Sequence, residues 1–382
     1  MHDAVLVDVV RTPVGKRGGG LSEVHSVDLS ASVLSALMDR VDRPASIVDD
    51  VVWGCVSQAG EQSSNIGRWA VLSAGWPDAI PATTVDRACG SSQQAIHFAA
   101  AAVMSGQCDV VIAGGVESMS RVPIGSARAH GPGEPRGPQI AKRYPDIEFN
   151  QGIAAELIAQ KWGFEREAMD AFSVSSHLKA HAAQGRGDFD LEIAAVQVGH
   201  TTVVRDEGVR PTTSIEALAR LEPAFLPDGR VTAGSSSPIS DGAAAALITS
   251  SATARRLGLT PRARFHSFAL AGVDPGMMLT GPIPATARVL DRSGLTLDDI
   301  GVFEVNEAFA SVTMAWLDET GADSARVNAW GGAIALGHPL GSSGARLLAT
   351  LLSRMEAGSH QYGLQTMCEA GGMANALIME RL

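Results

Sequence analysis

Residues 84–103, TVDRACGSSQQAIHFAAAAV, place a cysteine at the corner between a β-branched run and an alanine-rich stretch typical of a helix. Residues 326–352, RVNAWGGAIALGHPLGSSGARLLATLL, repeat this order, again with a corner that carries glycine and serine. Two further pairs of segments match in the same way: 45–59 with 295–310, and 108–120 with 365–382. The sequence therefore predicts an internal duplication that gives two similar α/β halves.

The rest of the chain supports an α/β fold with one insertion. Short apolar β-branched runs alternate with helical patterns, which indicates a sheet covered on both faces. The middle of the chain differs, because it opens with a loop rich in Gly, Pro and Arg and continues as an amphipathic helical stretch. We predict an N-terminal half formed by 1–117 plus 241–260, an inserted loop domain at 118–240, and a C-terminal half at 261–382.

Composition limits the function classes. The chain has 382 residues, 45% of them hydrophobic, and a net charge of −11, so no electrostatic argument favours nucleic acid or an anionic membrane. The amino terminus does not resemble a signal peptide, and no apolar run approaches the ~20 residues of a membrane span. The four cysteines are widely spaced without a C-x-x-C pair, which favours a reducing, cytoplasmic location over a zinc or disulfide framework.

Cys89 is the first candidate for chemistry. Its flanks predict a position in the first turn of a helix, where free N–H groups and the helix dipole stabilise a thiolate. Gly90 would allow another group to approach the sulfur closely. A buried structural cysteine is the alternative, and these residues alone leave both interpretations open. For Cys55 and Cys108, which we expect inside apolar strands, the structural interpretation is favoured.

Three more positions carry reactive groups at strand or helix ends. His338 lies in a glycine-rich corner, where a neutral imidazole can serve as a general base, and the absence of Gly-Lys-Ser/Thr excludes a Walker P-loop. Cys368 follows an apolar strand and is either structural or a proton donor. Asn306 stands before a helix, where it is also a common N-cap. His177 and His181, four residues apart without a third ligand, indicate a solvated helix face.

Four segments together resemble the thiolase family: DRACGSS around Cys89, NEAFA at 306–310, GGAIALGHPLGSSGAR at 331–346 and CEAGG at 368–372. The resemblance covers the whole chain in order, and it includes RTPVGKRGGGL near the start, AGGVESMS at 113–120 and TAGSSSPISDGAAA at 232–245. The NEAFA form is typical of thiolases proper, and it differs from sterol-carrier-type relatives and ketoacyl synthases. The resemblance implies two βαβαβαββ halves in α-β-α-β-α layers, with an inserted loop domain.

The resemblance also implies a role for each candidate. Cys89 would be the nucleophile that carries the acyl group as a thioester, His338 the base that activates it, and Cys368 the second acid/base. Asn306 would hold a water that forms one oxyanion hole with His338.

Two further positions complete the implied site. The backbone N–H groups of Cys89 and Ala370 would form the other oxyanion hole. Ser237 would contact the pantetheine of coenzyme A.

The implied reaction is cleavage of a 3-ketoacyl-CoA by CoA, as in fatty acid β-oxidation, or the reverse Claisen condensation, with ping-pong kinetics. Coenzyme A would be substrate and product, with no tightly bound cofactor and no metal. We expect a homodimer or homotetramer with no nucleic-acid partner and no membrane insertion. The negative phosphates of CoA could meet four arginines of the inserted loop: Arg121, Arg128, Arg136 and Arg143.

Three alternatives stay open. The first is a biosynthetic acetyl-CoA acetyltransferase that forms acetoacetyl-CoA. The second is a condensing enzyme that uses carrier-protein thioesters, which would want a second histidine near Cys368 and a basic docking patch. The third is a non-catalytic acyl-CoA-binding protein, which the full set of reactive residues disfavours.

Some positions depart from the family pattern. Asp86 stands where relatives usually have Asn, and Ser92 where many have Gly; Ala370 and Ala374 replace glycines. Ala370 keeps its backbone N–H, so the chemistry is unaffected. We expect these changes to alter the acyl pocket, in the manner of bacterial degradative thiolases that act on fatty or sterol-derived acyl-CoAs.

Overall fold

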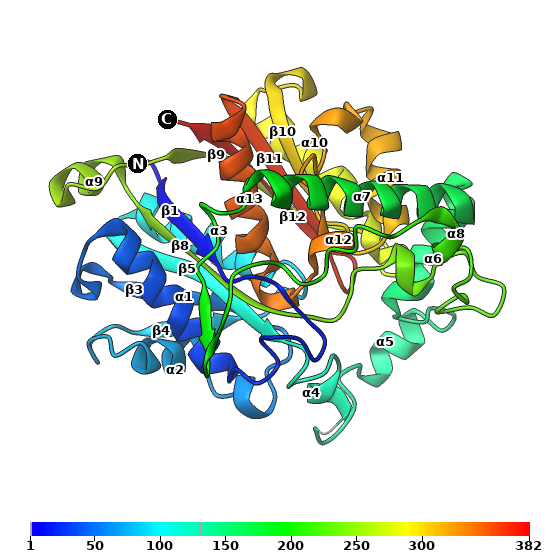
Figure 1. The fold of residues 1–382 in the computed structure, drawn as a ribbon, viewed down its shortest axis with the longest axis horizontal. Coiled ribbons are helices and arrows are strands. Elements are labelled where there is room, and N and C mark those ends of the chain that lie inside the picture. The colour runs from blue at the N-terminus through cyan, green and yellow to red at the C-terminus, as the bar shows by residue number, and fades with distance from the viewer. Residues whose placement is uncertain (1, 130) are drawn as a thin grey trace.

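The computed structural model describes residues 2–129 and 131–382 (Figure 1). Ten strands form one mixed sheet in the order β10-β11-β12-β9-β1-β8-β5-β3-β4, with β2 paired to β8. These strands are β1 Val5–Arg11, β2 Gly15–Lys16, β3 Asp50–Gly54, β4 Ala82–Val85, β5 Val110–Ser118, β8 Ser240–Thr249, β9 Ala263–Gly272, β10 Ile300–Val305, β11 Tyr362–Glu369 and β12 Met373–Arg381. A separate hairpin pairs β6 Val196–Val198 with β7 Thr201–Val203.

Three apolar cores define five layers. The first joins α1 and α2 to the N-terminal strands, the second surrounds α3 and α13 between the two sets of strands, and the third joins α10 and α11 to the C-terminal strands. The helices are α1 Ser26–Val41, α2 Ile66–Ser73, α3 Ser91–Ser105, α4 Ser126–Ala129, α5 Pro138–Arg143, α6 Gln151–Trp162, α7 Arg166–Arg186, α8 Ile215–Leu218, α9 Ser251–Leu257, α10 Pro282–Ser293, α11 Ala310–Thr320, α12 Ala333–Leu336 and α13 Ser343–Ala357. The expected α-β-α-β-α layering is confirmed. Within the described ranges, every helix is too short or too polar to cross a membrane.

The two halves are similar, but they differ in the segment that leads to each corner. In the first half β4 is a full strand that pairs with β3, whereas its counterpart in the second half is a single bridge between Phe303 and Val327. The side chain of Asn328 explains this difference, because its amide accepts the Val305 N–H at 2.9 Å and donates to the Val305 carbonyl at 2.8 Å. The Asn328 side chain thus makes the hydrogen bonds to the Val305 backbone that a neighbouring strand would otherwise make. The corners before α3 and α13 are therefore equivalent positions that carry Cys89 and His338.

The inserted segment leaves the sheet at the end of β5 and returns as β8, which lies antiparallel between β1 and β5. Two helices, α6 and α7, contact α11 of the C-terminal half. The insertion thus spans both halves on the side where the corners lie.

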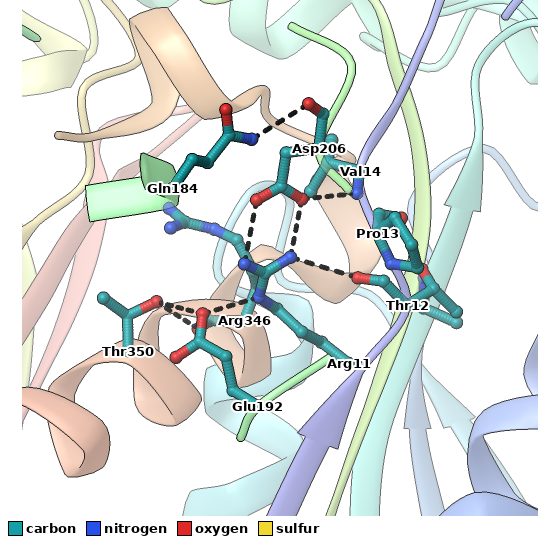
Figure 2. Close-up of polar contacts among 10 residues, drawn as sticks. Arg11, Thr12, Pro13, Val14, Gln184, Glu192, Asp206, Arg346 and Thr350 are labelled. Atoms are coloured by element: carbon teal, nitrogen blue, oxygen red, sulfur yellow. Dashed lines mark hydrogen bonds and ion pairs between the residues drawn. The ribbon is translucent and has the colours of Figure 1, made fainter. Parts of the chain in front are cut away.

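A buried ion cluster fastens this insertion to the first strand (Figure 2). The Arg11 guanidinium, at the end of β1, donates to Glu192 Oε1 at 2.7 Å and to both Asp206 oxygens at 2.6 and 2.9 Å. Asp206 also accepts the Val14 N–H at 2.7 Å. Arg346 of α13 lies beside this cluster, and none of its three nitrogens has a hydrogen-bond partner among the described residues. The positive charges of Arg11 and Arg346 thus lie in one buried site with the two carboxylates.

Replacing Arg11 with methionine should destabilise the protein strongly, because Glu192 and Asp206 would remain buried without their partner. We expect a loss of about 3–5 kcal/mol in the free energy of urea unfolding. The control is Arg256→Met, which breaks an ion pair with Asp109 at 2.6 Å whose side chains are 59% and 64% exposed. This control should cost about 0–1 kcal/mol. Equal losses in the two variants would contradict the role given to the cluster.

Candidate active site

Cys89 lies in a tight turn between β4 and α3. Gly90 is the N-cap of the helix, so Cys89 precedes the helix and is not in its first turn as predicted. The turn requires Ala88 in the left-handed region, at φ 46°. Asp86 Oδ1 supports it by accepting the Ala88 N–H at 2.7 Å, and Ser91 Oγ donates to the Ala88 carbonyl at 2.6 Å. Side chains of the turn itself therefore hold the cysteine in place.

The Cys89 thiol keeps its proton in the unliganded protein. Burial raises its pKa to about 12, and the negative charge of Glu369 adds to this effect. The backbone N–H groups of Cys89 and Ala370 act in the opposite direction. The predicted thiolate stabilised by the helix terminus is therefore wrong for the free protein, because desolvation outweighs the N–H groups. Cys89 needs a base before it can act as a nucleophile.

His338 supplies a neutral imidazole. It lies in the turn between α12 and α13, and burial together with the charge of Arg346 lowers its pKa to about 3. Nδ1 lies 2.6 Å from Ser343 Oγ, which in turn donates to the Pro339 carbonyl at 2.9 Å. This network assigns the ring proton to Nδ1. Nε2 is then the acceptor, and it lies 3.3 Å from Nδ2 of Asn306.

Asn306 and Cys368 complete the set. Asn306 directly follows β10, and the N-cap of α11 is Phe309, so Asn306 is not the N-cap that its position suggested. Its Oδ1 is buried and has no hydrogen-bond partner in the described part of the chain. Cys368 lies within β11, and burial, followed by the charges of Cys89 and Glu369, raises its pKa well above the usual range. Cys368 therefore also keeps its proton at neutral pH.

A cavity of about 870 Å³ opens at these groups. His338 and Ala370 both line it, and the Ala370 N–H that faces the Cys89 sulfur links the nucleophile to the same space. Ser237 is part of the wall, and its N–H donates to the Ala308 carbonyl at 3.0 Å. Much of the remaining wall is apolar: Met119, Ile124, Ile140, Phe149, Phe225, Ile239, Met278, Phe309 and Leu340. The cavity can take an extended apolar ligand whose reacting end lies beside His338.

Two of the four loop arginines line this cavity, namely Arg128 and Arg136. Arg121 instead pairs with Glu61, at 2.8 Å from each carboxylate oxygen. Arg143 lies over the Tyr144 ring, 5.1 Å from its centre. The structure thus reduces the candidates for a phosphate contact from four to two.

Of the four departures from the family pattern, Ala370 lines the cavity, whereas Asp86, Ser92 and Ala374 do not. Asp86 shapes the Cys89 turn, and Ser92 Oγ accepts the Ala345 N–H at 3.0 Å, which joins α3 to α13. Asp86 and Ser92 therefore do not contact the cavity directly, and their effect on the acyl pocket stays a prediction. Ala374 pairs with Cys368 in the β11–β12 ladder.

The other sulfur and imidazole groups lie elsewhere. Cys55 directly follows β3 and is buried, whereas Cys108 lies in the turn before β5 and is partly exposed, so neither is inside a strand as predicted. His177 is buried and its Nδ1 accepts the Arg210 N–H at 3.1 Å, whereas His181 is exposed, so the predicted solvated helix face holds for His181 and not for His177. Residues 2–129 and 131–382 contain no group of three His, Cys, Asp or Glu side chains placed to hold a metal ion.

Sequence reasoning missed Glu369, which the structure places close to Cys89. Its side chain packs on Gly90, where an added Cβ would lie 2.0 Å from Oε1. Both carboxyl oxygens are buried, and neither has a hydrogen-bond partner in the described ranges. Burial raises the pKa of Glu369 to about 8, although Arg87 opposes the shift. The signal was a charged residue at the end of an otherwise uncharged strand, directly after Cys368.

Glu369→Gln should make Cys89 more reactive at alkaline pH. Below pH 8 the glutamate is mostly protonated, so the variant and the wild type should react with iodoacetamide at similar rates. Above pH 8 the wild-type carboxylate ionises and opposes the Cys89 thiolate, and the variant lacks this charge. When the alkylation rate is measured from pH 6 to 10, the pH at which it begins to rise should therefore be lower in the variant than in the wild type. A wild-type rate that equals or exceeds the variant's at pH 9 would contradict this.

The chain was compared with known proteins. A family model described as "Thiolase, N-terminal domain" matches residues 4–252, and one described as "Thiolase, C-terminal domain" matches 259–381. A steroid 3-ketoacyl-CoA thiolase, FadA6, of Mycobacterium tuberculosis is 50% identical over 100% of this chain and 95% of its own. A 3-ketoacyl-CoA thiolase of Erwinia tasmaniensis is 47% identical, with all of both chains covered.

The fold agrees with these matches. The crystal structure of the acetyl-CoA acetyltransferase of Bacillus anthracis superposes with a TM-score of 0.91 at 35% identity, over 100% of this chain and 99% of that one. Both family models together account for nearly the whole chain. The chain belongs to the thiolase family of acyltransferases.

Proposed function

We propose that the protein cleaves 3-ketoacyl-CoA esters with CoA, through an acyl group carried on Cys89. One observation carries this proposal: two backbone N–H groups face the Cys89 sulfur at the cavity wall where the neutral His338 lies. Acyl transfer to sulfur requires a protonated thiol, a neutral base and two N–H groups beside the same cavity.

In the first half-reaction, Nε2 of His338 takes the proton of Cys89, and the sulfur attacks the 3-keto carbon of the substrate. The oxygen of that carbonyl becomes negative next to the N–H groups of Cys89 and Ala370. The bond between C2 and C3 then breaks, and the acyl group remains on Cys89 as a thioester. Asn306, together with His338, would stabilise the oxygen of the departing acetyl-CoA enolate, which takes a proton from Cys368.

In the second half-reaction, the Cys368 thiolate removes the proton of an incoming CoA thiol. The CoA sulfur attacks the thioester, the bond to Cys89 breaks, and the shortened acyl-CoA leaves. Cys89 recovers its proton from His338, so the protein returns to its starting state. The high pKa of Cys368 suits this role, because a thiol that holds its proton can donate it to a carbanion.

We propose a bulky apolar acyl chain and the degradative direction. The apolar wall of the 870 Å³ cavity supports this, and so does the relative named as a steroid thiolase. The solved acetyl-CoA acetyltransferase favours acetoacetyl-CoA synthesis as a second candidate. Ser237 would contact pantetheine, and Arg128 and Arg136 would meet the phosphates of CoA.

The setting of the reaction belongs to the same proposal. We place it in the cytoplasm, within fatty acid β-oxidation or the degradation of sterol-derived acyl-CoAs, and with CoA as the only coenzyme. We infer a homodimer or homotetramer. The exposed Trp69 of α2 and Phe98 of α3 support this, because both helices contact the edge strand β4. The division into two halves and a loop domain at 118–240 is a working description of the chain that fits its exit from the sheet at Ser118.

Cys89→Ser should abolish thiolysis while leaving the fold intact, because a hydroxyl is a far weaker nucleophile than a thiol. The rate of 3-ketoacyl-CoA consumption should fall on the order of 10⁴-fold or more. Cys108→Ser is the matched control, since Cys108 is a free and partly exposed cysteine away from the cavity, and it should keep full activity. Substantial activity in Cys89→Ser would exclude the assigned nucleophile.

The preferred length of the acyl chain should distinguish 3-ketoacyl-CoA degradation from acetoacetyl-CoA synthesis. Each methylene buried in an apolar wall contributes about 0.8 kcal/mol, so a substrate with several more methylenes than acetoacetyl-CoA should gain at least ~10-fold in kcat/KM. The measurement compares thiolysis of acetoacetyl-CoA with that of a long-chain and a sterol-derived 3-ketoacyl-CoA. A clear preference for acetoacetyl-CoA would favour the biosynthetic candidate.

A further inference from the structure

Glu117 is a buried carboxylate that the reaction does not use directly. It lies near the end of β5 and has no exposed surface. Its Oε1 accepts the Ser57 N–H at 3.0 Å and Nε2 of Gln62 at 2.9 Å, and its Oε2 accepts the N–H groups of Val56 and Gly341, each at 3.0 Å. Burial raises the pKa of this carboxyl, whereas the four donors stabilise its charged form. If the Glu117 carboxyl were protonated, its O–H would point at one of these N–H groups, and two donors would face each other.

The Gly341 backbone packs directly on the sheet of the first half. Gly54 of β3 and Gly115 of β5 are register partners, and together they leave a hollow in the sheet surface. A Cβ on Gly115 would lie 2.1 Å from the Gly341 carbonyl oxygen, and one on Gly54 would lie 2.8 Å from it. A Cβ on Gly341 itself would lie 2.2 Å from the Val116 carbonyl oxygen. Three glycines therefore allow a backbone-to-backbone contact that side chains would prevent.

This contact lies in the turn that carries the base. Gly341 is three residues after His338, within the 337–343 turn. The His338 N–H donates to Ser240 Oγ at 3.0 Å at the start of the turn, and Ser343 Oγ contacts its Nδ1 at the end. Glu117 holds the middle of the turn through the Gly341 N–H. The same carboxylate also holds the segment after β3, so it joins elements of both halves.

We propose that Glu117 is a positioning residue for the general base. Its carboxylate fixes the 337–343 turn against β3 and β5, and this sets the distance between Nε2 of His338 and the Cys89 sulfur. The inference rests on the proposed function, since it takes His338 as the base for Cys89. The attachment of the turn is a property of the fold and can be measured without turnover.

Two effects of Glu117 have opposite signs, which makes the proposal testable. The negative charge of Glu117 is among the causes that raise the pKa of Cys89. Removing that charge alone should therefore make Cys89 easier to ionise. Releasing the turn should instead slow the reaction, because His338 no longer has a fixed distance to the thiol.

The experiment uses Glu117→Gln in the full chain. The amide keeps the size of the side chain, but its NH₂ group would face two of the four N–H donors, so one side of the clamp opens. We expect kcat for 3-ketoacyl-CoA thiolysis to fall on the order of 100-fold, with little change in KM. Amide hydrogen exchange in a peptide that covers 337–343 should become faster. The folded fraction, followed by circular dichroism, should stay close to that of the wild type.

Asp49→Asn is the matched control. Asp49 lies at the other end of β5, where its Oδ2 accepts the N–H groups of Asp109 at 2.7 Å and Val110 at 2.9 Å. It is exposed and far along the strand from the turn. This variant should keep both the wild-type kcat and the wild-type exchange rate in 337–343.

Two results would overturn the proposal. A folded Glu117→Gln protein with wild-type kcat and exchange would show that the turn does not depend on the carboxylate. A loss of kcat without faster exchange would assign Glu117 to the chemistry rather than to positioning. If Glu117→Gln does not fold, Glu117→Asp replaces it, because the charge stays while the carboxylate withdraws by one methylene. We then expect an intermediate loss of kcat and faster exchange in 337–343. No change in either quantity would overturn the proposal. Wild-type protein without thiolase activity would refute the proposed function but leave the exchange result to stand alone.

Discussion

Desolvation is the constraint on which the site depends. Cys89 and His338 are both buried at the interface between the two halves, and burial disfavours the charged form of each. The unliganded protein therefore holds a thiol and a neutral imidazole, although a thiolate–imidazolium pair would be the more reactive state. Charge develops only when a substrate carbonyl is present to receive it and N–H groups are in place to stabilise the oxygen. This arrangement protects the cysteine from side reactions between turnovers.

The duplicated fold explains how the two groups meet. In the first half, β4 leads through a glycine-bearing corner into α3. In the second half, the bridge at Val327 and the short helix α12 lead through such a corner into α13, and α3 and α13 pack together in the middle layer. One corner carries Cys89, the proposed nucleophile, and the other carries His338, the proposed base. Because the halves differ in their corner residues, a symmetric scaffold produces an asymmetric site. Glycines and buried carboxylates fix the relative position of the corners, since they allow backbone contacts that larger side chains would block.

The sequence and its resemblance to the thiolase family predicted the layered fold, because strand–corner–helix order and long motifs are visible in the chain. The roles given to the reactive residues stay predictions. Local details were less predictable. The left-handed conformation of Ala88 places Cys89 before its helix. It depends on the hydrogen bonds of Ala88 with Asp86 and Ser91, which only the folded turn reveals. The direction of the Cys89 pKa shift was wrong because the degree of burial depends on the packing of both halves. The contacts of Glu369 and Glu117 join residues distant in sequence, so no local pattern identifies their roles.

The central claim is that Cys89 carries the acyl group between the two half-reactions. The most direct measurement is to mix the protein with a 3-ketoacyl-CoA in the absence of free CoA, digest it at acidic pH, and locate acylated peptides by mass spectrometry. The account predicts an acyl thioester on Cys89, with Cys55, Cys108 and Cys368 unmodified and one acetyl-CoA released per acylated site. Acylation at another cysteine, or release of acetyl-CoA with Cys89 unmodified, would contradict it.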